Sequence, residues 1–258
     1  MAGITLQGLS RVYWSRAYPQ GLVALDKVSL AVADREFVCL LGPSGCGKTT
    51  VLNVLSGLDQ QYLGEIRVAG KLLSRDGAHP FRIGYVFQEP RLLPWLTVRG
   101  NIEFALEPAG IPRSEWRERV NAWLTRVGLN DFAQAYPHEL SGGMQQRTAI
   151  ARAFAVDPEL LLMDEPFSGL DELTARSMRE LLLGLWQETR KTVLFVTHNC
   201  FEACFVADRI IVLSPRPGRI TQEIRVELPR PRDYENPGLF EQSVAVTRVV
   251  TGGATSQT

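Results

Sequence analysis

Eight consecutive residues contain the clearest chemical signal in this chain. Their glycines, lysine and threonine have the spacing G-x-x-x-x-G-K-[ST] in the segment Gly42-Pro43-Ser44-Gly45-Cys46-Gly47-Lys48-Thr49, called the phosphate loop below. Glycines let consecutive backbone N–H groups turn inward around phosphates, Lys48 adds a cation, and the Thr49 hydroxyl is a ligand for Mg²⁺. We therefore predict that this loop, together with Thr50, binds a nucleotide.

The residues on either side of the phosphate loop fit that prediction. Residues 37–41 form an apolar run typical of a buried strand, and residues 50–58 have a helical pattern with Gly57 as C-cap. The phosphates would then lie at a helix N-terminus, where the helix dipole favours anions. An ordinary glycine-rich turn explains neither the strand nor the helix.

A pair of adjacent carboxylates indicates phosphoryl chemistry. Asp164 and Glu165 directly follow the apolar residues 160–163. Asp164 would reach Mg²⁺ through a water molecule, and Glu165 would orient or deprotonate the attacking water. On its own such a pair is an acidic turn at the end of a strand, and only the presence of Lys48 makes the catalytic interpretation the better one.

The composition excludes several classes of protein. The 258 residues include 28 basic and 28 acidic side chains, so no net positive charge attracts nucleic acid or anionic lipid. No apolar run approaches the roughly 18 residues of a membrane span, and no secretory signal is visible. We expect a soluble cytoplasmic protein that reaches a membrane only through a partner.

The four cysteines are interpreted from their surroundings. Cys200 and Cys204 lie near His198, but a structural zinc site needs about four ligands and a second close pair is missing. We expect both to be small apolar residues on one helical face. Cys46 lies at the start of a helix, where a thiol pKa is lowered, and we expect its sulfur to be accessible without nucleotide.

The first half of the chain changes from strand to helical patterns. Residues 4–9 and 23–32 alternate in the manner of strands and predict an antiparallel β layer. From about residue 97 to residue 156 the period becomes helical, and Thr97 and Ser114 are suited to be N-caps. We interpret residues 97–156 as an inserted helical subdomain.

The second half predicts a parallel sheet and a tail. Apolar strands at residues 160–163 and 192–196 are separated by a helix at 172–189, an order that implies parallel strands covered on both faces. Residues 210–228 indicate a β hairpin. A proline-rich stretch then leads into a short helix at about residues 239–250.

A second motif follows the phosphate loop in the segment Leu140-Ser141-Gly142-Gly143-Met144-Gln145-Gln146. It precedes a helix predicted at residues 145–156, so Ser141 and the amides of Gly142 and Gly143 would form another anion site. This motif resembles the signature of ATP-binding-cassette (ABC) ATPases. The resemblance covers residues 4–225.

The resemblance assigns roles to further residues. Gln88 matches the glutamine that joins the Mg²⁺ and water shell and senses a transmembrane partner, and His198 matches the switch histidine that contacts the γ-phosphate. Residues 168–171 resemble the D-loop that crosses between two cassettes, so Asp171 is implied to lie at the nucleotide. Asn199 departs from the pattern, because an aspartate is common there.

An aromatic side chain near the N-terminus is implied to stack on adenine. Tyr13 resembles that residue, although extra residues separate it from the strand at 23–32. Trp14 or Tyr18 are alternatives, and any of the three would otherwise belong to the core.

The implied fold class is α/β, a P-loop NTPase cassette with a mixed β core, an N-terminal antiparallel β layer and an inserted α-helical subdomain. We expect the cassette to comprise residues 1–228, with residues 97–156 inserted. Residues 229–258 would form a short C-terminal extension.

Two segments resemble one branch of the family, the ATPases of nitrate, sulfonate, taurine and bicarbonate importers. They are residues 88–98 and residues 213–220, which read QEPRLLPWLTV and LSPRPGRI. The resemblance implies an ATP-hydrolysing subunit that drives uptake of a small anion through a separate permease. Trp95 is expected to be an exposed interface anchor, and a core position is the alternative.

The resemblance also implies partners. One phosphate loop and one signature per chain imply head-to-tail pairing, with ATP and Mg²⁺ between Lys48 of one cassette and Ser141 of the other. The second cassette, permease subunits and, indirectly, a solute-binding protein are expected on the cytoplasmic face of the inner membrane, without nucleic acid. A catalytically silent regulatory subunit is the alternative, whereas a small-molecule kinase has no use for residues 140–146.

Overall fold

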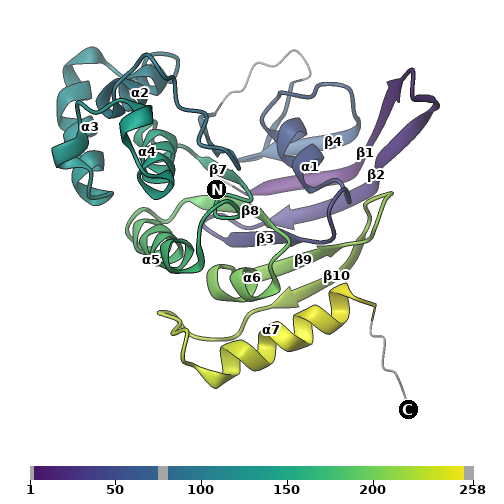
Figure 1. Ribbon diagram of the computed structural model, residues 1–258. Helices are drawn as coiled ribbons and strands as arrows, with labels where there is room; N and C mark the ends of the chain where they lie inside the picture. Colours follow the sequence, from purple (N-terminus) through teal and green to yellow (C-terminus); the bar gives the residue numbers. More distant parts are fainter. Residues whose placement is uncertain (1–2, 75–80, 253–258) are drawn as a thin grey trace. The chain divides into compact units, whose positions relative to one another are not determined.

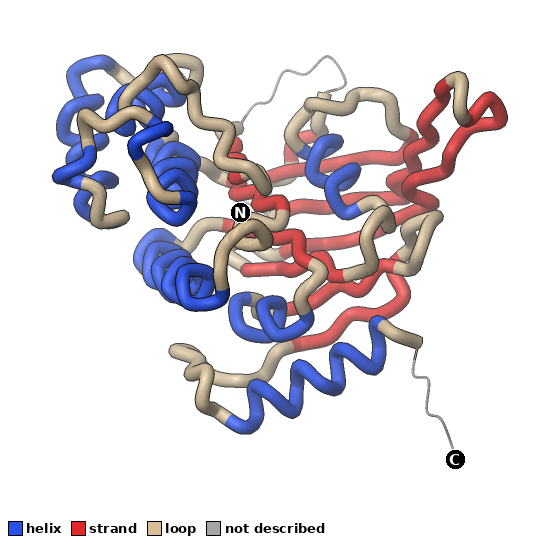
Figure 2. Tube along the Cα trace, viewed as in Figure 1, coloured by secondary structure: helices blue, strands red, loops and turns tan. Residues whose placement is uncertain are grey.

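The computed structural model describes residues 3–74 and 81–252 (Figure 1). These residues belong to two compact units. The first unit combines the chain before residue 81 with the chain after residue 191, and the second unit contains residues 81–191. Figure 2 marks their helices and strands. Within the described ranges, no helix has the length and apolar character needed to cross a membrane.

The first unit contains the predicted antiparallel sheet. Its four strands, in the order β2-β1-β4-β5, are β2 (Tyr18–Val32), β1 (Ile4–Ser15), β4 (Leu63–Val68) and β5 (Lys71–Leu72). At the start of β1 the side chains of Ile4 and Leu6 are buried, while Thr5 between them is partly exposed. This two-residue alternation is typical of a sheet with one covered face.

The hairpin formed by β1 and β2 is longer than predicted. We expected strands only at residues 4–9 and 23–32, but pairing continues to the end of the hairpin, where Ser15 lies opposite Tyr18. Most side chains of residues 13–21 are exposed or only partly buried. Their strand conformation therefore depends on backbone pairing across the hairpin, which an apolar alternation cannot reveal.

Parallel strands form the centre of the first unit. β3 (Phe37–Leu41) lies between β8 (Thr192–Thr197) and β9 (Arg209–Leu213), parallel to both, and β10 (Ile220–Arg225) runs antiparallel to β9. Every residue of β3 and β8 is buried, as expected for strands covered on both faces. The predicted strands at these positions are confirmed, whereas β10 ends before residue 228.

Helices of the first unit are α1 (Lys48–Leu55), α6 (Cys200–Val206) and α7 (Pro237–Val250). α1 begins earlier and ends earlier than the predicted range of residues 50–58. Gly57 follows it with a φ of 75°, the left-handed conformation that commonly terminates helices. α7 packs against α6.

The helical part of the second unit contains α2 (Val98–Leu106), α3 (Arg113–Arg126) and α4 (Gly142–Ala155). Thr97 is the N-cap of α2, as predicted, because its Oγ1 accepts a hydrogen bond from the N–H of Gly100 at 3.1 Å. The prediction for Ser114 is wrong. An N-cap at Ser114 would start the helix at residue 115, but α3 begins two residues earlier, after Pro112, whose φ of −57° is already that of a helix.

Strands β6 (Ile83–Val86) and β7 (Leu160–Asp164) pair in parallel in the second unit. α4 packs so closely on β6 that a Cβ at Gly84 would lie 2.4 Å from the carbonyl oxygen of Ala153. α5 (Glu172–Thr189) follows β7 and has the bounds predicted from the sequence.

Candidate functional site

The phosphate loop joins β3 to α1 in the first unit. Gly45 and Gly47 have φ angles of 77° and 102°, which favour glycine because it lacks a Cβ. Backbone turns of this kind direct successive N–H groups into one concavity and so bind anions. Gly47 is also the N-cap of α1, so the positive end of the helix dipole faces the loop.

Lys48 reaches back across the phosphate loop. Its Nζ donates hydrogen bonds to the carbonyl oxygens of Gly42 at 2.8 Å and Pro43 at 3.1 Å. Lys48 is buried, with 5% of its surface exposed. The ammonium group therefore lies within the loop. A cation held there by two backbone carbonyls is placed to bind phosphate oxygens.

Cys46 differs from the sequence prediction. We expected an accessible thiol, but the residue is fully buried. Its sulfur lies 3.9 Å from Nζ of Lys48 and would be 2.9 Å from a Cβ at Gly42. The loop wraps around this side chain, so Cys46 fills the base of the loop and its sulfur does not face solvent.

The other cysteines are packed or partly packed. Cys39 in β3 and Cys204 in α6 are buried, and burial is the main cause that raises the pKa of both thiols, that of Cys204 to about 12. Cys200 is half-buried on the same helix, one turn before Cys204. The two residues share a helical face, as predicted.

His198 follows β8 at the edge of the sheet from which the phosphate loop leaves β3. The parallel register pairs Leu41 with Thr197, so the phosphate loop and His198 emerge side by side. In the next residue, Asn199, the side-chain Oδ1 accepts a hydrogen bond from the N–H of Glu202 at 3.0 Å and caps α6. Asparagine and aspartate both make this cap, so the departure at Asn199 preserves the local structure.

Tyr13 lies in β1 and contacts α1. Its hydroxyl donates a hydrogen bond to Oγ1 of Thr50 at 3.3 Å. The guanidinium of Arg11 lies over one face of the ring, 4.2 Å from the centroid, and Nε of Arg11 donates to the Asp59 carboxylate at 2.7 Å. A base that stacks on Tyr13 must therefore use the opposite face.

The alternatives to Tyr13 lie nearer the turn of the hairpin. Trp14 is 67% exposed and Tyr18 is 47% exposed. The bond to Thr50, next to the phosphate loop, favours Tyr13 among the three aromatic residues. Arg11 was not predicted, although its spacing from Tyr13 places both on one face of a strand.

In the second unit, Gln88 is connected to Glu165 through a serine. Nε2 of Gln88 donates to Oγ of Ser168 at 3.2 Å, and Oγ of Ser168 donates to the carbonyl oxygen of Glu165 at 3.0 Å. The parallel register places Val86 opposite Met163, so both segments follow their strands at one edge. The bridging role of Ser168 was not predicted.

The two carboxylates have different backbone environments. Asp164 is the buried last residue of β7, whereas Glu165 has a φ of 44° in the left-handed region. Such a conformation in a residue other than glycine costs about 1 kcal/mol or more and is common at functional sites. Burial and, to a lesser degree, the charge of Asp164 raise the pKa of the Tyr85 phenol, so this hydroxyl stays protonated.

The signature segment forms the start of α4. Oγ of Ser141 accepts a hydrogen bond from the N–H of Met144 at 3.3 Å, so the helix begins at Gly142, earlier than the predicted residue 145. A Cβ at Gly143 would lie 2.8 Å from Cγ2 of Thr174, which explains a glycine there. Ser141 and Gly142 are exposed, so the positive end of this helix is accessible to an anion.

Asp171 is the N-cap of α5. Its Oδ1 accepts a hydrogen bond from the N–H of Thr174 at 3.0 Å. Hydrogen bonds from the Thr174 side chain and from backbone N–H groups hold the pKa of Asp171 below its ordinary value. Asp171 is exposed, so its carboxylate remains open to a partner while it caps α5.

Comparison with known proteins decides the family. Residues 25–168 match the ABC transporter family. The chain is 52% identical to a putative ATP-binding protein of Brucella abortus over 82% of this chain and 80% of the relative. This chain belongs to the ABC transporter family. It is an ATP-binding protein and an ATPase of this family, as the sequence predicts.

Relatives of this ABC transporter ATPase include named import proteins. This chain is 40% identical to the nitrate import ATP-binding protein NrtD of Synechocystis, over 99% of this chain and 97% of that protein. Identity to the taurine import ATP-binding protein TauB of Rhizobium johnstonii is 44%, over 85% and 82% of the two chains.

The structure also resembles a solved ABC transporter cassette. The ATP-binding cassette MJ0796, described as a dimer in a post-hydrolysis state with ADP and Pi, matches with a TM-score of 0.74 and 33% identity, over 87% of this chain and 99% of that chain. This match confirms the predicted α/β P-loop NTPase cassette fold.

Proposed function

We propose that this ATPase is the ATP-hydrolysing subunit of an ABC importer that takes up a small anion through a separate permease. The names of relatives that import taurine, nitrate and aliphatic sulfonates support this proposal. The observation that carries it is the phosphate loop, with Lys48 held over Gly42 and Pro43 at the start of α1. A silent regulatory subunit is the second candidate, but Lys48, Glu165 and His198 are all present.

The nucleotide is proposed to bind in the phosphate loop with its adenine on Tyr13. Oxygen atoms of Thr49, Gln88 and Asp164 are a hydroxyl, an amide and a carboxylate, a donor set that fits Mg²⁺. Bound Mg²⁺ would supply charge neutralisation at the phosphates. Lys48 would bind phosphate oxygens and hold them in position.

Hydrolysis is proposed to use Glu165 and His198. The Glu165 carboxylate accepts a hydrogen bond from the attacking water, aligns it with the γ-phosphorus and takes its proton as the new P–O bond forms. The bond between the γ-phosphorus and the β–γ bridging oxygen breaks in the same step, and ADP leaves with that oxygen. His198 donates a hydrogen bond to a γ-phosphate oxygen and stabilises the charge that develops there. Gln88 orients the water through its side-chain amide.

Two cassettes are proposed to pair head to tail around the nucleotide. In that pair, the exposed start of α4 with Ser141, Gly142 and Gly143 binds the γ-phosphate of ATP held by the other subunit, and Asp171 lies at the same interface. ATP binding would close the pair and hydrolysis would release it, which is a ligand-driven shift between two states. The second cassette is either identical or a different chain.

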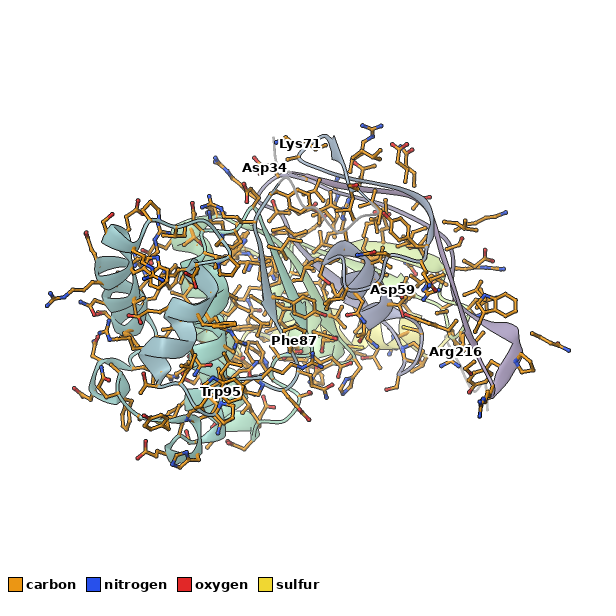
Figure 3. The ribbon with its side chains drawn as sticks, turned by 90° about the horizontal axis from the view of Figure 1, so that it is seen from above. Asp34, Asp59, Lys71, Phe87, Trp95 and Arg216 are labelled. Carbon is orange, nitrogen blue, oxygen red and sulfur yellow. The ribbon has the colours of Figure 1, made fainter. Side chains whose placement is uncertain are left out.

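The permease is proposed to bind near Gln88 and Trp95 on the cytoplasmic face of the inner membrane. Trp95 lies between β6 and α2 and is 69% exposed, so the alternative of a core position is wrong (Figure 3). A large exposed aromatic side chain is a typical interface anchor. A solute-binding protein would deliver the anion to the permease on the other side, and no nucleic acid takes part.

Transport by the purified complex tests the proposal. The tagged chain is isolated from its native membrane in mild detergent, and the complex is reconstituted into vesicles that hold MgATP inside, with the solute-binding protein and the anion outside. We expect ATP-dependent uptake of one of nitrate, taurine, an aliphatic sulfonate or bicarbonate, and no uptake with Lys48→Ala. Hydrolysis without any co-purifying membrane protein would contradict the importer function, and absence of hydrolysis would favour the regulatory subunit.

A further inference from the structure

The loop that joins β9 to β10, residues 214–219, lies against the phosphate loop. Nε of Arg216 donates a hydrogen bond to the carbonyl oxygen of Gly45 at 3.3 Å. At Gly218 a Cβ would stand 2.1 Å from the carbonyl oxygen of Cys46. Only a glycine permits this approach, so the two loops contact each other backbone to backbone.

Hydrogen bonds to β2 fix the position of this loop. The N–H of Gly218 donates to the carbonyl oxygen of Ala24 at 2.9 Å, and the carbonyl oxygen of Gly218 accepts from the N–H of Asp26 at 3.0 Å. Nε of Arg219 donates to the Asp26 carboxylate at 2.9 Å. Arg216 is therefore presented to the phosphate loop by an anchored backbone.

Among the described residues, no carboxylate neutralises the charge of Arg216. Arg11 and Arg219 each pair with a carboxylate, but no carboxylate lies within ion-pair distance of Arg216 in residues 3–74 and 81–252. Its side chain is exposed, and within the same ranges only Nε makes a hydrogen bond. Two terminal amino groups of a planar cation thus remain available at the rim of an anion-binding loop.

We propose that Arg216 is a further phosphate-binding residue of the nucleotide site. It acts in two ways: it holds the Gly45 peptide by its carbonyl oxygen, and it places a positive charge beside the phosphate chain. This inference rests on the proposed function, in which the phosphate loop binds ATP.

The first action follows from the geometry of one peptide unit. The carbonyl of Gly45 and the N–H of Cys46 belong to the same peptide, and that N–H donates to the carbonyl oxygen of Pro43 at 3.3 Å, so Arg216 and Pro43 hold this peptide of the phosphate loop from both sides. An exposed cation about 4 Å from a phosphate oxygen contributes roughly three- to tenfold in affinity. The effect must therefore appear in nucleotide binding and must weaken with salt.

The test compares charge and hydrogen bonding at position 216. Binding of MgATP, inorganic tripolyphosphate and adenosine is measured by calorimetry for the wild type, Arg216→Ala, Arg216→Gln and Arg216→Lys. We expect about three- to tenfold weaker binding of MgATP and tripolyphosphate in Arg216→Ala and Arg216→Gln, with partial recovery in Arg216→Lys. Adenosine binding, which involves no phosphate, should stay within about twofold, and the loss should shrink in 0.5 M salt.

Arg225→Gln is the matched control. Arg225 is an exposed arginine at the far end of β10, so this variant removes the same charge from the same hairpin away from the phosphate loop. Binding of MgATP to Arg225→Gln should equal that of the wild type. An equal loss in Arg225→Gln would show that only net charge matters and would overturn the inference.

Other outcomes are equally decisive. Unchanged MgATP binding in Arg216→Ala would show that Arg216 does not bind phosphate. Equal losses of adenosine and tripolyphosphate binding, together with a lower melting temperature, would show that Arg216 only stabilises the fold. Lys48→Ala distinguishes the inference from the proposed function. If Lys48→Ala loses MgATP binding and Arg216→Ala does not, only the role of Arg216 fails. If the wild type itself binds no MgATP, the proposed function fails.

Discussion

Glu165 directly follows β7 in a left-handed backbone conformation, and its carbonyl oxygen accepts a hydrogen bond from Oγ of Ser168. This local constraint directs the side chain that is proposed to align the attacking water.

Replacement of Glu165 by glutamine should separate binding from hydrolysis. Glutamine keeps the shape but cannot take the proton of the attacking water, so we expect the hydrolysis rate to fall about 10²- to 10⁴-fold. Affinity for MgATP should be retained, and ATP should trap a dimer. Phosphate release and size-exclusion chromatography measure both properties, and near wild-type turnover would contradict the assigned role.

Tyr13 is the residue on which the base is proposed to stack. Tyr13→Ala should weaken MgATP binding by about tenfold, because base stacking on an aromatic ring is lost, and should leave tripolyphosphate binding unchanged. Tyr13→Phe keeps the ring but loses the bond to Thr50, so it should bind nearly as the wild type does. Trp14→Ala is the control, and a larger loss there than in Tyr13→Ala would move the stacking role to Trp14.

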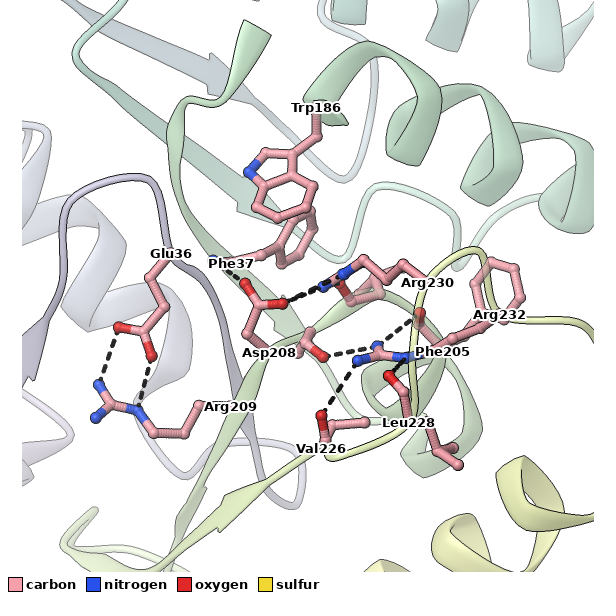
Figure 4. Close-up of polar contacts among 12 residues, drawn as sticks. Glu36, Phe37, Trp186, Phe205, Asp208, Arg209, Val226, Leu228, Arg230 and Arg232 are labelled. Carbon is pink, nitrogen blue, oxygen red and sulfur yellow. Dashed lines mark hydrogen bonds and ion pairs between the residues drawn. The ribbon is translucent and has the colours of Figure 1, made fainter. Parts of the chain in front are cut away.

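At the scale of elements, Arg232 connects the segment before α7 to the end of α6 (Figure 4). Its Nη1 donates to the carbonyl oxygens of Cys204 at 2.9 Å, Phe205 at 3.0 Å and Ala207 at 2.7 Å. These carbonyls lie at the C-terminus of α6. The last carbonyl oxygens of a helix have no N–H donor within the helix, and the helix dipole stabilises a cation there. Burial is the main cause that lowers the pKa of Arg232 to about 10.

Arg232→Met should therefore destabilise the first unit. Methionine fills much of the volume but leaves several buried carbonyl oxygens without a donor, so we expect a loss of about 2–4 kcal/mol in the free energy of unfolding. Arg248→Met, at an exposed position in the last turn of α7, should change stability by less than about 0.5 kcal/mol. Urea denaturation measures both variants, and equal stability of the two would contradict the capping role.

At the scale of the whole molecule, the exposed Trp95 is expected to serve a partner and not the fold. Trp95→Ala in the isolated ATPase should change the free energy of unfolding by less than about 0.5 kcal/mol and leave MgATP hydrolysis intact. Co-purification with the permease should weaken. Phe240→Ala removes another exposed aromatic side chain, on α7, and should leave permease binding unchanged. A stability loss of several kcal/mol in Trp95→Ala with full permease binding would contradict the anchor role.

Patterns within one segment of the chain determined much of this protein. The phosphate loop, β3, β8 and α5 were predicted from residue spacing and short apolar periods, because each is specified by neighbours along the sequence. The family also followed from the order of such local motifs. Helix starts were less certain, as Ser114 shows, because several polar residues near one proline fit an N-cap equally well.

The tertiary structure alone decided which distant segments meet. It extended the hairpin at Ser15 and Tyr18, buried Cys46 beneath its loop, and placed Arg232 at the end of α6. It also brought Arg216 to Gly45, across 171 positions of sequence. The hydrophobic periodicity of a segment indicates which of its side chains face a core. The burial and the hydrogen bonds of a side chain also depend on the segments that pack against it, and these come together only when the chain folds.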